Sequence, residues 1–126
     1  MSSDTQAQRF RFSAVLCLVI RKERKRVGVH GAAVAAHLGV TREQYASLEH
    51  GRTEITIQQI WLVARALNVR PRTLWRIAET WAEHLQVAGW IEDKSATRVP
   101  YDLLERTIQD AMENSVVRVA GNPAIG

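Results

Sequence analysis

Residues 28–56 of this 126-residue chain read GVHGAAVAAHLGVTREQYASLEHGRTEIT, and this stretch decides the fold. Its alanine-rich part, residues 31–38, predicts a short helix that a neighbouring helix can approach closely. Gly39 ends this helix at a turn whose backbone angle would disfavour a side chain. Thr41, followed three residues later by glutamine, is typical of a capping box and predicts a second short helix over residues 42–50. We therefore expect two short helices joined by a tight turn.

Hydrophobic spacing predicts four more helices around this pair. Apolar side chains recur in each of them every three or four positions, as on a helix face that packs against a core. Threonine, proline and glycine stand where such helices begin and end. The expected helices cover residues 12–27, 57–67, 71–87 and a last stretch that begins at Pro100. In the helix over residues 57–67, the side chains expected to face inward are Ile57, Ile60, Trp61, Ala64 and Leu67.

The remaining stretches lack this spacing. Residues 1–11 are predicted to form a flexible arm, residues 89–99 a loop and residues 120–126 a flexible tail. Between the last helix and this tail, a short strand is an open alternative, because three β-branched residues follow one another there: Val116, Val117 and Val119.

Charge is divided unevenly along the chain, whose formal net charge is +4. Residues 1–80 hold 13 basic and 6 acidic side chains, whereas residues 81–126 hold 4 basic and 7 acidic ones. The first part therefore attracts a phosphate backbone, and the second part would be repelled by it. The acidic part needs a different role.

Several classes of protein do not fit the sequence. The single cysteine, Cys17, cannot form an internal disulfide and is expected to lie buried in the first helix. The apolar run over residues 14–20 is about a third of the length of a membrane span, and nothing resembles a signal peptide. The histidines are scattered, and no phosphate loop, nucleophile elbow or carboxylate pair is recognisable. We expect a cytoplasmic protein without membrane contact, catalysis, metal or cofactor.

The order and spacing of the motifs resemble the lambda-repressor-like family, also known as Cro/repressor or XRE-type helix-turn-helix proteins. The resemblance covers residues 12–76 and rests on the following elements: Ile20-Arg21, Arg24, Gly28-Val29, Ala35, Leu38-Gly39-Val40-Thr41, Tyr45, Leu48-Glu49-His50-Gly51-Arg52, Ala64, Leu67 and Val69. It implies an all-α fold, with a five-helix repressor-like helix-turn-helix domain over residues 12–80 and an additional C-terminal helical segment over residues 81–119. It also implies a transcriptional regulator, a repressor or a controller of its own operon, that binds double-stranded DNA with its third helix in the major groove.

Two residues depart from the family pattern. The family often has glutamine at the start of the second helix, where it contacts phosphate and braces the third helix. This chain has Gly31 at that place, preceded by His30. Tyr45 occupies an inward position that more often holds isoleucine or valine. The bracing contact is therefore either absent or supplied by His30.

The resemblance assigns roles to residues in and around the third helix. Tyr45 and Leu48 face inward, which leaves four residues to read base edges: Arg42, Glu43, Gln44 and Ser47. An arginine fork fits guanine, a carboxylate fits the cytosine amino group and an amide fits adenine, although Gln44 is also needed for its capping box. Phosphate contacts are expected from His30, Gly31, Arg52 and Thr53.

A structural ion pair is also implied by the resemblance. Arg24 matches the arginine that pairs with a glutamate at the end of the third helix, and that glutamate is Glu49 here. Such a pair fastens the first helix to the third, so we expect it to be partly buried.

The acidic segment over residues 81–119 is expected to hold two copies of the chain together. One helix-turn-helix reads only a few base pairs, and a dimer that places two reading helices about 34 Å apart supplies the specificity. The large residues expected to anchor this dimer are Trp81, Leu85, Trp90, Tyr101, Leu104 and Ile108. The same side chains could instead complete the core of their own monomer.

Two other functions stay open at this point. The acidic segment also fits an antitoxin-like protein-interaction module whose C-terminal half binds a partner protein. The other alternative is a helical sensor with a small-molecule pocket in the tryptophan-rich half. The 46 residues beyond Thr80 leave little room for a sizeable pocket of that kind.

Overall fold

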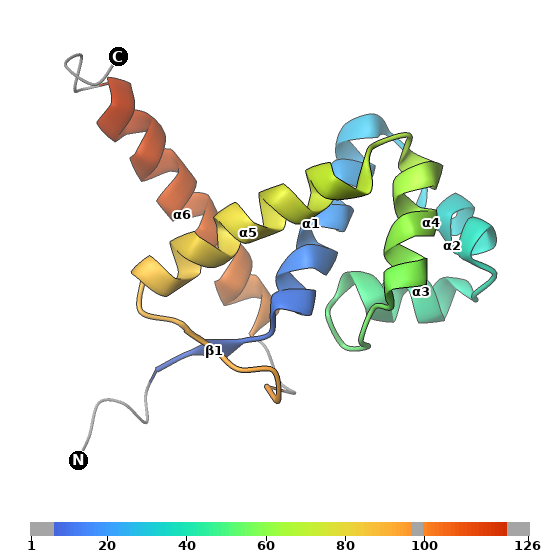
Figure 1. Cartoon of the computed structure of the whole chain (residues 1–126), viewed down its shortest axis with the longest axis horizontal. Helices are drawn as coiled ribbons and strands as arrows, with labels where there is room; N and C mark the ends of the chain where they lie inside the picture. Colours follow the sequence, from blue (N-terminus) through green and yellow to red (C-terminus); the bar gives the residue numbers. More distant parts are fainter. Residues whose placement is uncertain (1–6, 97–99, 121–126) are drawn as a thin grey trace.

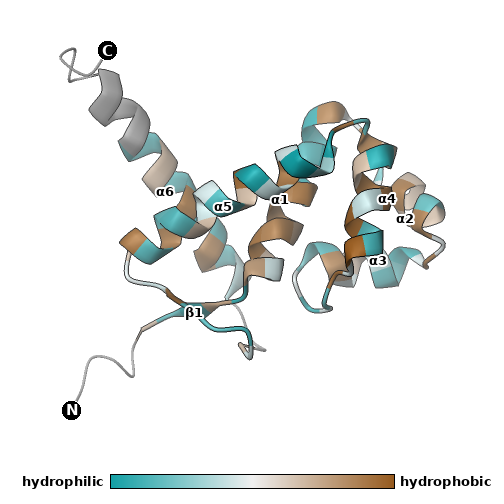
Figure 2. Cartoon of the chain, viewed as in Figure 1, coloured by the Kyte–Doolittle hydropathy of each residue, from teal (hydrophilic) through white to brown (hydrophobic). Residues whose placement is uncertain are grey.

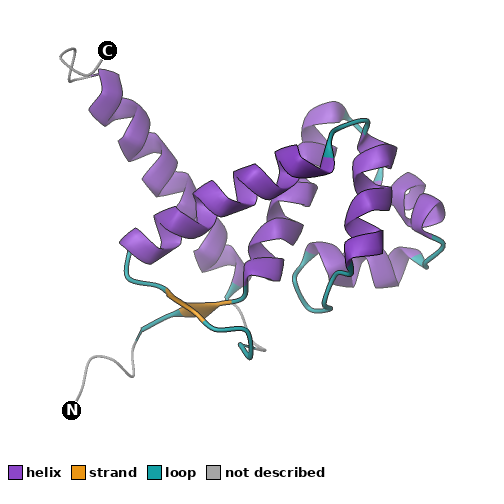
Figure 3. Cartoon of the chain, in the orientation of Figure 1, coloured by secondary structure: helices purple, strands orange, loops and turns teal. Residues whose placement is uncertain are grey.

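The structure, a computed structural model, describes residues 7–96 and 100–120. Within these ranges it contains six helices, which are α1 (Phe12–Val27), α2 (Gly31–Leu38), α3 (Arg42–Glu49), α4 (Ile57–Leu67), α5 (Pro71–Val87) and α6 (Tyr101–Ala120). Two strands of two residues each, β1 (Arg9–Phe10) and β2 (Ile91–Glu92), pair in parallel. The predicted all-α fold is confirmed, with one further helix after the five of the repressor-like arrangement (Figure 3).

The central helix of the fold is α1. Every residue from Ala14 to Ile20 is buried, because α3, α4 and α5 all pack against α1. A helix that is apolar on all sides is stable in water only when neighbours cover all of it. Figure 2 shows the hydrophobic residues gathered on α1 where it passes α5. Cys17 lies in this buried stretch, and burial raises the pKa of its thiol to about 12.

The helix-turn-helix pair lies at one end of the molecule, and α5 and α6 cross at the other (Figure 1). Between α2 and α3 the chain turns at Gly39, whose φ of 73° is in the left-handed region that favours glycine. Both α3 and α4 begin with a complete capping box, at Thr41 and Thr56. The caps fix where each helix begins, and the predicted starts of these two helices are confirmed.

The predicted flexible arm over residues 1–11 is wrong for the residues that the structure describes. The Phe10 side chain is fully buried, and its ring lies edge-on to Trp90 at a centroid distance of 6.5 Å. The amide of Asp93 donates to the carbonyl of Phe10 at 2.8 Å. The predicted loop over residues 89–99 therefore contains a strand. A strand of two residues is too short to show the alternation by which strands are recognised.

Helix α6 continues to Ala120, so the alternative of a strand at Val116, Val117 and Val119 is wrong. The predicted tail over residues 120–126 lies outside the described residues from position 121 onward. The same holds for residues 1–6 of the predicted arm and residues 97–99 of the predicted loop.

The acidic segment packs on its own chain. Leu85, Trp90, Leu104 and Ile108 are at most 7% exposed, so assigning them to a dimer contact is wrong. Trp81 and Tyr101 are half-buried against the same core. Folding of the monomer removes these apolar side chains from water, and this burial stabilises the packing of α6.

Two residues of α4 that were predicted to face inward are exposed instead. Ile57 and Trp61, expected to face inward, are 85% and 50% exposed. The buried face is formed by Val63, Ala64 and Leu67, because α1 and α2 pack against that side. Two large apolar side chains on α4 therefore face solvent.

Phe10 gives a direct test of the anchored N-terminal segment. Replacing Phe10 with alanine removes a fully buried ring and leaves a cavity, so we expect a loss of about 3–5 kcal/mol in the free energy of unfolding. Val87, which is 88% exposed, is the control, and Val87→Ala should change stability by less than about 0.5 kcal/mol. Both variants are measured by urea denaturation. A flexible arm would make Phe10→Ala as mild as the control.

Candidate nucleic-acid interface

The helix predicted to read bases, α3, has one locked face and one open face. Its buried residues are Tyr45, Leu48 and Glu49. The side chains on the other face are exposed, apart from the half-buried Ser47, and they are Arg42, Glu43, Gln44, Ala46 and Ser47. In the described part of the chain, Arg42 forms no ion pair. The predicted base-reading residues therefore stand together on a surface that the protein itself leaves open.

The capping box restricts what Gln44 can do. The Gln44 side-chain oxygen accepts a hydrogen bond from the Thr41 amide at 2.8 Å, and the Thr41 hydroxyl accepts one from the Gln44 amide at 3.0 Å. Bidentate contact with adenine needs both the oxygen and the amino group of a glutamine side chain. Gln44 therefore cannot make that contact while it caps the helix, and only its amino group is free.

The Arg24–Glu49 pair is present, with the geometry that the resemblance implies. Arg24 Nε lies 2.5 Å from Glu49 Oε2, and Arg24 Nη2 lies 3.0 Å from Glu49 Oε1. The two side chains are 15% and 7% exposed. The hydrogen bond to Glu49 raises the pKa of Arg24, so the guanidinium stays charged. A bidentate, nearly buried pair of this kind holds the end of α3 against α1.

The two departures from the family pattern are neighbours in space. Tyr45 donates its hydroxyl hydrogen to Glu49 Oε2 at 2.6 Å, and its ring lies beside Gly31. A Cβ atom at Gly31 would stand 3.5 Å from the Tyr45 ring and 3.8 Å from the Arg24 guanidinium. A long side chain there would have to avoid both groups. The tyrosine thus takes the space that the glycine leaves, and it braces α3 from within.

Burial raises the pKa of Tyr45, and its hydrogen bond to Glu49 adds to this shift. The hydroxyl therefore stays protonated and remains a donor to the Glu49 carboxylate. Glu49 accepts hydrogen bonds from both Arg24 and Tyr45, and no buried side-chain polar atom among the described residues lacks a partner. The buried polar side chains at the C-terminal end of α3 therefore all have hydrogen-bond partners.

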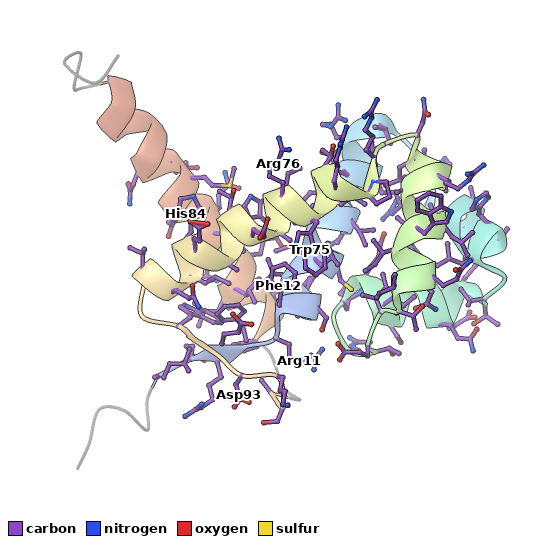
Figure 4. All side chains as sticks on the ribbon, viewed as in Figure 1. Arg11, Phe12, Trp75, Arg76, His84 and Asp93 are labelled. Carbon is purple, nitrogen blue, oxygen red and sulfur yellow. The ribbon has the colours of Figure 1, made fainter. Side chains whose placement is uncertain are left out.

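The end of α3 is held from two further directions that the sequence did not reveal. Arg11, just before α1, donates to the carbonyl of Gly51, and Tyr101 of α6 donates its hydroxyl hydrogen to the carbonyl of Glu49. Figure 4 shows Arg11 near Asp93, on the side of the molecule that carries the strands. Single residues far apart in the chain give no local pattern, so only the structure shows that they converge.

The predicted phosphate-binding residues lie on both flanks of α3. Arg52 and Thr53 are exposed in the segment after α3. His30 and Gly31 stand at the start of α2 and line a groove of about 730 Å³ together with Arg42. The His30 side chain does not cap α2, so its ring is available to a ligand. His30 and Gly31 therefore border the open face of α3 beside Arg42, whereas Arg52 and Thr53 follow the C-terminal end of the helix.

Residues 20–79 match the family model described as helix-turn-helix. The matched range contains α2, α3 and α4 whole and ends within α5. This segment is a helix-turn-helix domain. More particularly, it belongs to the lambda-repressor-like (XRE-type) family, a DNA-binding family of transcription regulators. The comparisons with curated proteins and with solved structures find no match.

Two kinds of feature are absent from the described residues. Across residues 7–96 and 100–120, no helix combines the length and the hydrophobicity that crossing a membrane requires. The same residues hold no group of three or more histidine, cysteine, aspartate or glutamate side chains placed to bind a metal ion.

Two of the arginine–glutamate pairs among the described residues, Arg24–Glu49 and Arg26–Glu23, differ in the burial of the arginine and make a matched test. Arg24→Ala leaves the Glu49 carboxylate buried without its cation, so we expect a loss of about 3 kcal/mol in the free energy of unfolding. Arg26 pairs with Glu23 at 2.9 Å but its side chain is 65% exposed. Arg26→Ala should therefore cost less than about 0.5 kcal/mol. Equal losses in urea denaturation would contradict the role of the buried pair.

Proposed function

We propose that the protein binds double-stranded DNA at specific sequences and regulates transcription with α3 in the major groove. The observation that carries this proposal is the contrast between the two faces of α3. Tyr45, Leu48 and Glu49 fix the inner face, while Arg42 and its neighbours stay open to solvent. A rigid helix with an open polar face is what reading of base edges requires.

Each side chain on the open face of α3 suits a different base. Arg42 supplies a bidentate fork for guanine, and Glu43 accepts a hydrogen bond from the cytosine amino group. The Ser47 hydroxyl can donate or accept, so it can bind to different bases. Ala46 adds a small apolar contact for a thymine methyl group. Gln44 contributes its amino group, because its oxygen belongs to the cap. Phosphates are bound on either flank by His30, Gly31, Arg52 and Thr53.

The regulator acts as a repressor or as a controller of its own operon. Its positive charge is concentrated in residues 1–80, where the DNA-binding domain lies. Occupying an operator is the simplest action for such a protein, since it needs only this domain. No catalytic step and no cofactor enter this proposal.

The protein binds as a homodimer, and its contact surface is not the acidic segment. Ile57, Trp61 and Trp75 are 85%, 50% and 47% exposed, and we term them the α4–α5 apolar surface. Ile57 and Trp75 line the same hollow, and Trp61 lies one helical turn after Ile57. The Trp75 ring packs against the Phe12 ring at an interplanar angle of 54°, with the ring centroids 4.8 Å apart (Figure 4). Large exposed apolar patches on a monomer commonly mark a contact site. This surface replaces the buried residues first expected to form the dimer.

The position of the α4–α5 apolar surface suits a dimer on DNA. Ile57 follows Arg52 and Thr53 by a few residues, so the surface begins where the predicted phosphate contacts end. A partner seated on it would stand beside the DNA-facing side of α3. A two-fold axis through this contact would direct both reading helices toward one duplex, on half-sites about 34 Å apart.

Base reading by α3 is tested with DNA sites selected from random sequence. The double variant Arg42→Ala, Ser47→Ala removes the guanine fork and its neighbour, so the specific shift should be lost. The cost of Arg42→Ala alone is about 1–3 kcal/mol of binding free energy. Arg106→Ala, an exposed arginine of α6, is the control and should leave the shift intact. Circular dichroism checks that all variants remain helical. An unaltered shift in the double variant would remove α3 from the reading role.

Dimerisation is tested without DNA. Sedimentation of the unaltered protein should show a concentration-dependent dimer, and Trp61→Ser combined with Trp75→Ser should leave a monomer, because the apolar contact is removed. Val87→Ser, an exposed apolar residue at the far end of α5, should dimerise normally. A monomer at all concentrations of the unaltered protein, or a dimer in the double variant, would refute this contact surface.

A further inference from the structure

A second open site is formed by residues of α1, α5 and α6, and it shares no lining residue with the groove beside α3. Helices α1, α5 and α6 enclose a cleft of about 420 Å³, and most of its lining is apolar. The apolar lining consists of Val19, Ile77, Trp81 and Met112, with Lys22, Glu23, Arg76 and Thr80 at the rim. A smaller hollow of about 160 Å³ adjoins it and shares Lys22, Trp81 and Met112. A volume of this size matches that of small-molecule sites.

The rim of this cleft, the α1–α5–α6 cleft, has an excess of positive charge. Glu105 is shared by two cations, with Lys22 Nζ at 2.5 Å and Arg21 at 3.7 Å. The hydrogen bond from Lys22 lowers the pKa of Glu105, so its carboxylate stays ionised. Glu23 is neutralised by Arg26. Arg76 forms no ion pair among the described residues, and it therefore leaves an uncompensated charge at the rim.

We propose that the α1–α5–α6 cleft binds a small organic carboxylate with a flat apolar body, and that this ligand regulates DNA binding. The apolar body packs against the Trp81 indole and the Met112 side chain, whose flexibility suits ligands of varied shape. The carboxylate binds Arg76 at the rim. Figure 4 shows Arg76 on a different side of α5 from Trp75, so the site is separate from the α4–α5 apolar surface.

Helix α6 links this cleft to the reading helix. Its middle part lines both hollows through Met112 and the smaller one also through Ile108. Its first residue, Tyr101, donates its hydroxyl hydrogen to the carbonyl of Glu49 and packs beside His50, with ring centroids 5.8 Å apart. A ligand that shifts α6 therefore changes how the end of α3 is held. This coupling rests on the proposed DNA-binding function, whereas binding of the ligand does not.

Ligand binding is tested by calorimetry with 1-naphthaleneacetate as the probe and 1-naphthaleneethanol as its neutral counterpart. We expect saturable binding of one naphthaleneacetate per chain and much weaker binding of the alcohol. Arg76→Gln should weaken binding of the acid about tenfold, the loss expected for one charged hydrogen bond. Arg72→Gln, on an exposed neighbouring turn of α5, and Trp75→Ser should bind as the unaltered protein does. Absence of saturable binding, or an unchanged affinity in Arg76→Gln, would overturn the site.

Coupling is tested by measuring affinity for the selected DNA site with and without saturating naphthaleneacetate. We expect the probe to change this affinity by about fivefold or more, as is usual for coupled sites. Tyr101→Phe should keep the probe affinity but lose the effect on DNA, because only the hydrogen bond to α3 is removed. An effect that persists in Tyr101→Phe, or no effect in the unaltered protein, would overturn the regulatory link. Probe binding without any DNA binding would refute the proposed function and leave the site standing.

Discussion

The carboxylate of Glu49 is the point on which the arrangement of the reading helix depends. It is buried, and an isolated buried charge is costly unless cations and hydrogen-bond donors surround it. Arg24 supplies the charge from α1, and Tyr45 supplies a neutral donor from within α3. The backbone carbonyl of the same residue is bound by Tyr101 of α6. Three helices are thus tied to one residue, and the open face of α3 is oriented by this junction.

The sequence predicts the helical part of the fold well, because the signals for helices are local. Apolar spacing, glycine at a left-handed turn and two capping boxes lie within a few residues of the ends that they define. The orientation of α4 was mispredicted at Ile57 and Trp61 for a physical reason. Periodicity identifies an apolar stripe, but it cannot distinguish a side chain buried in the monomer from one left for a partner.

The candidate site was predictable where a residue's role follows from its place on one helix or from the resemblance. The outward position of Arg42 and the pairing of Arg24 with Glu49 are of this kind. The mutual fit of Gly31 and Tyr45 needed coordinates, since the sequence shows two separate departures and the structure shows a single compensated packing arrangement. The contacts of Arg11 with the end of α3 span 40 positions, and no pattern in the sequence marks them.

The pairing of β1 with β2 has a practical consequence for anyone who divides this protein. The segment before α1 and the segment after α5 close on each other, and Arg11 in the first of them and Tyr101 at the start of α6 also contact the end of α3. A DNA-binding fragment trimmed to the helix-turn-helix match alone would lose Phe10, Trp90 and Tyr101 together, exposing the flank of the reading helix. Fusion partners and affinity tags are therefore best joined at the chain termini, and a hybrid regulator should borrow the whole folded unit.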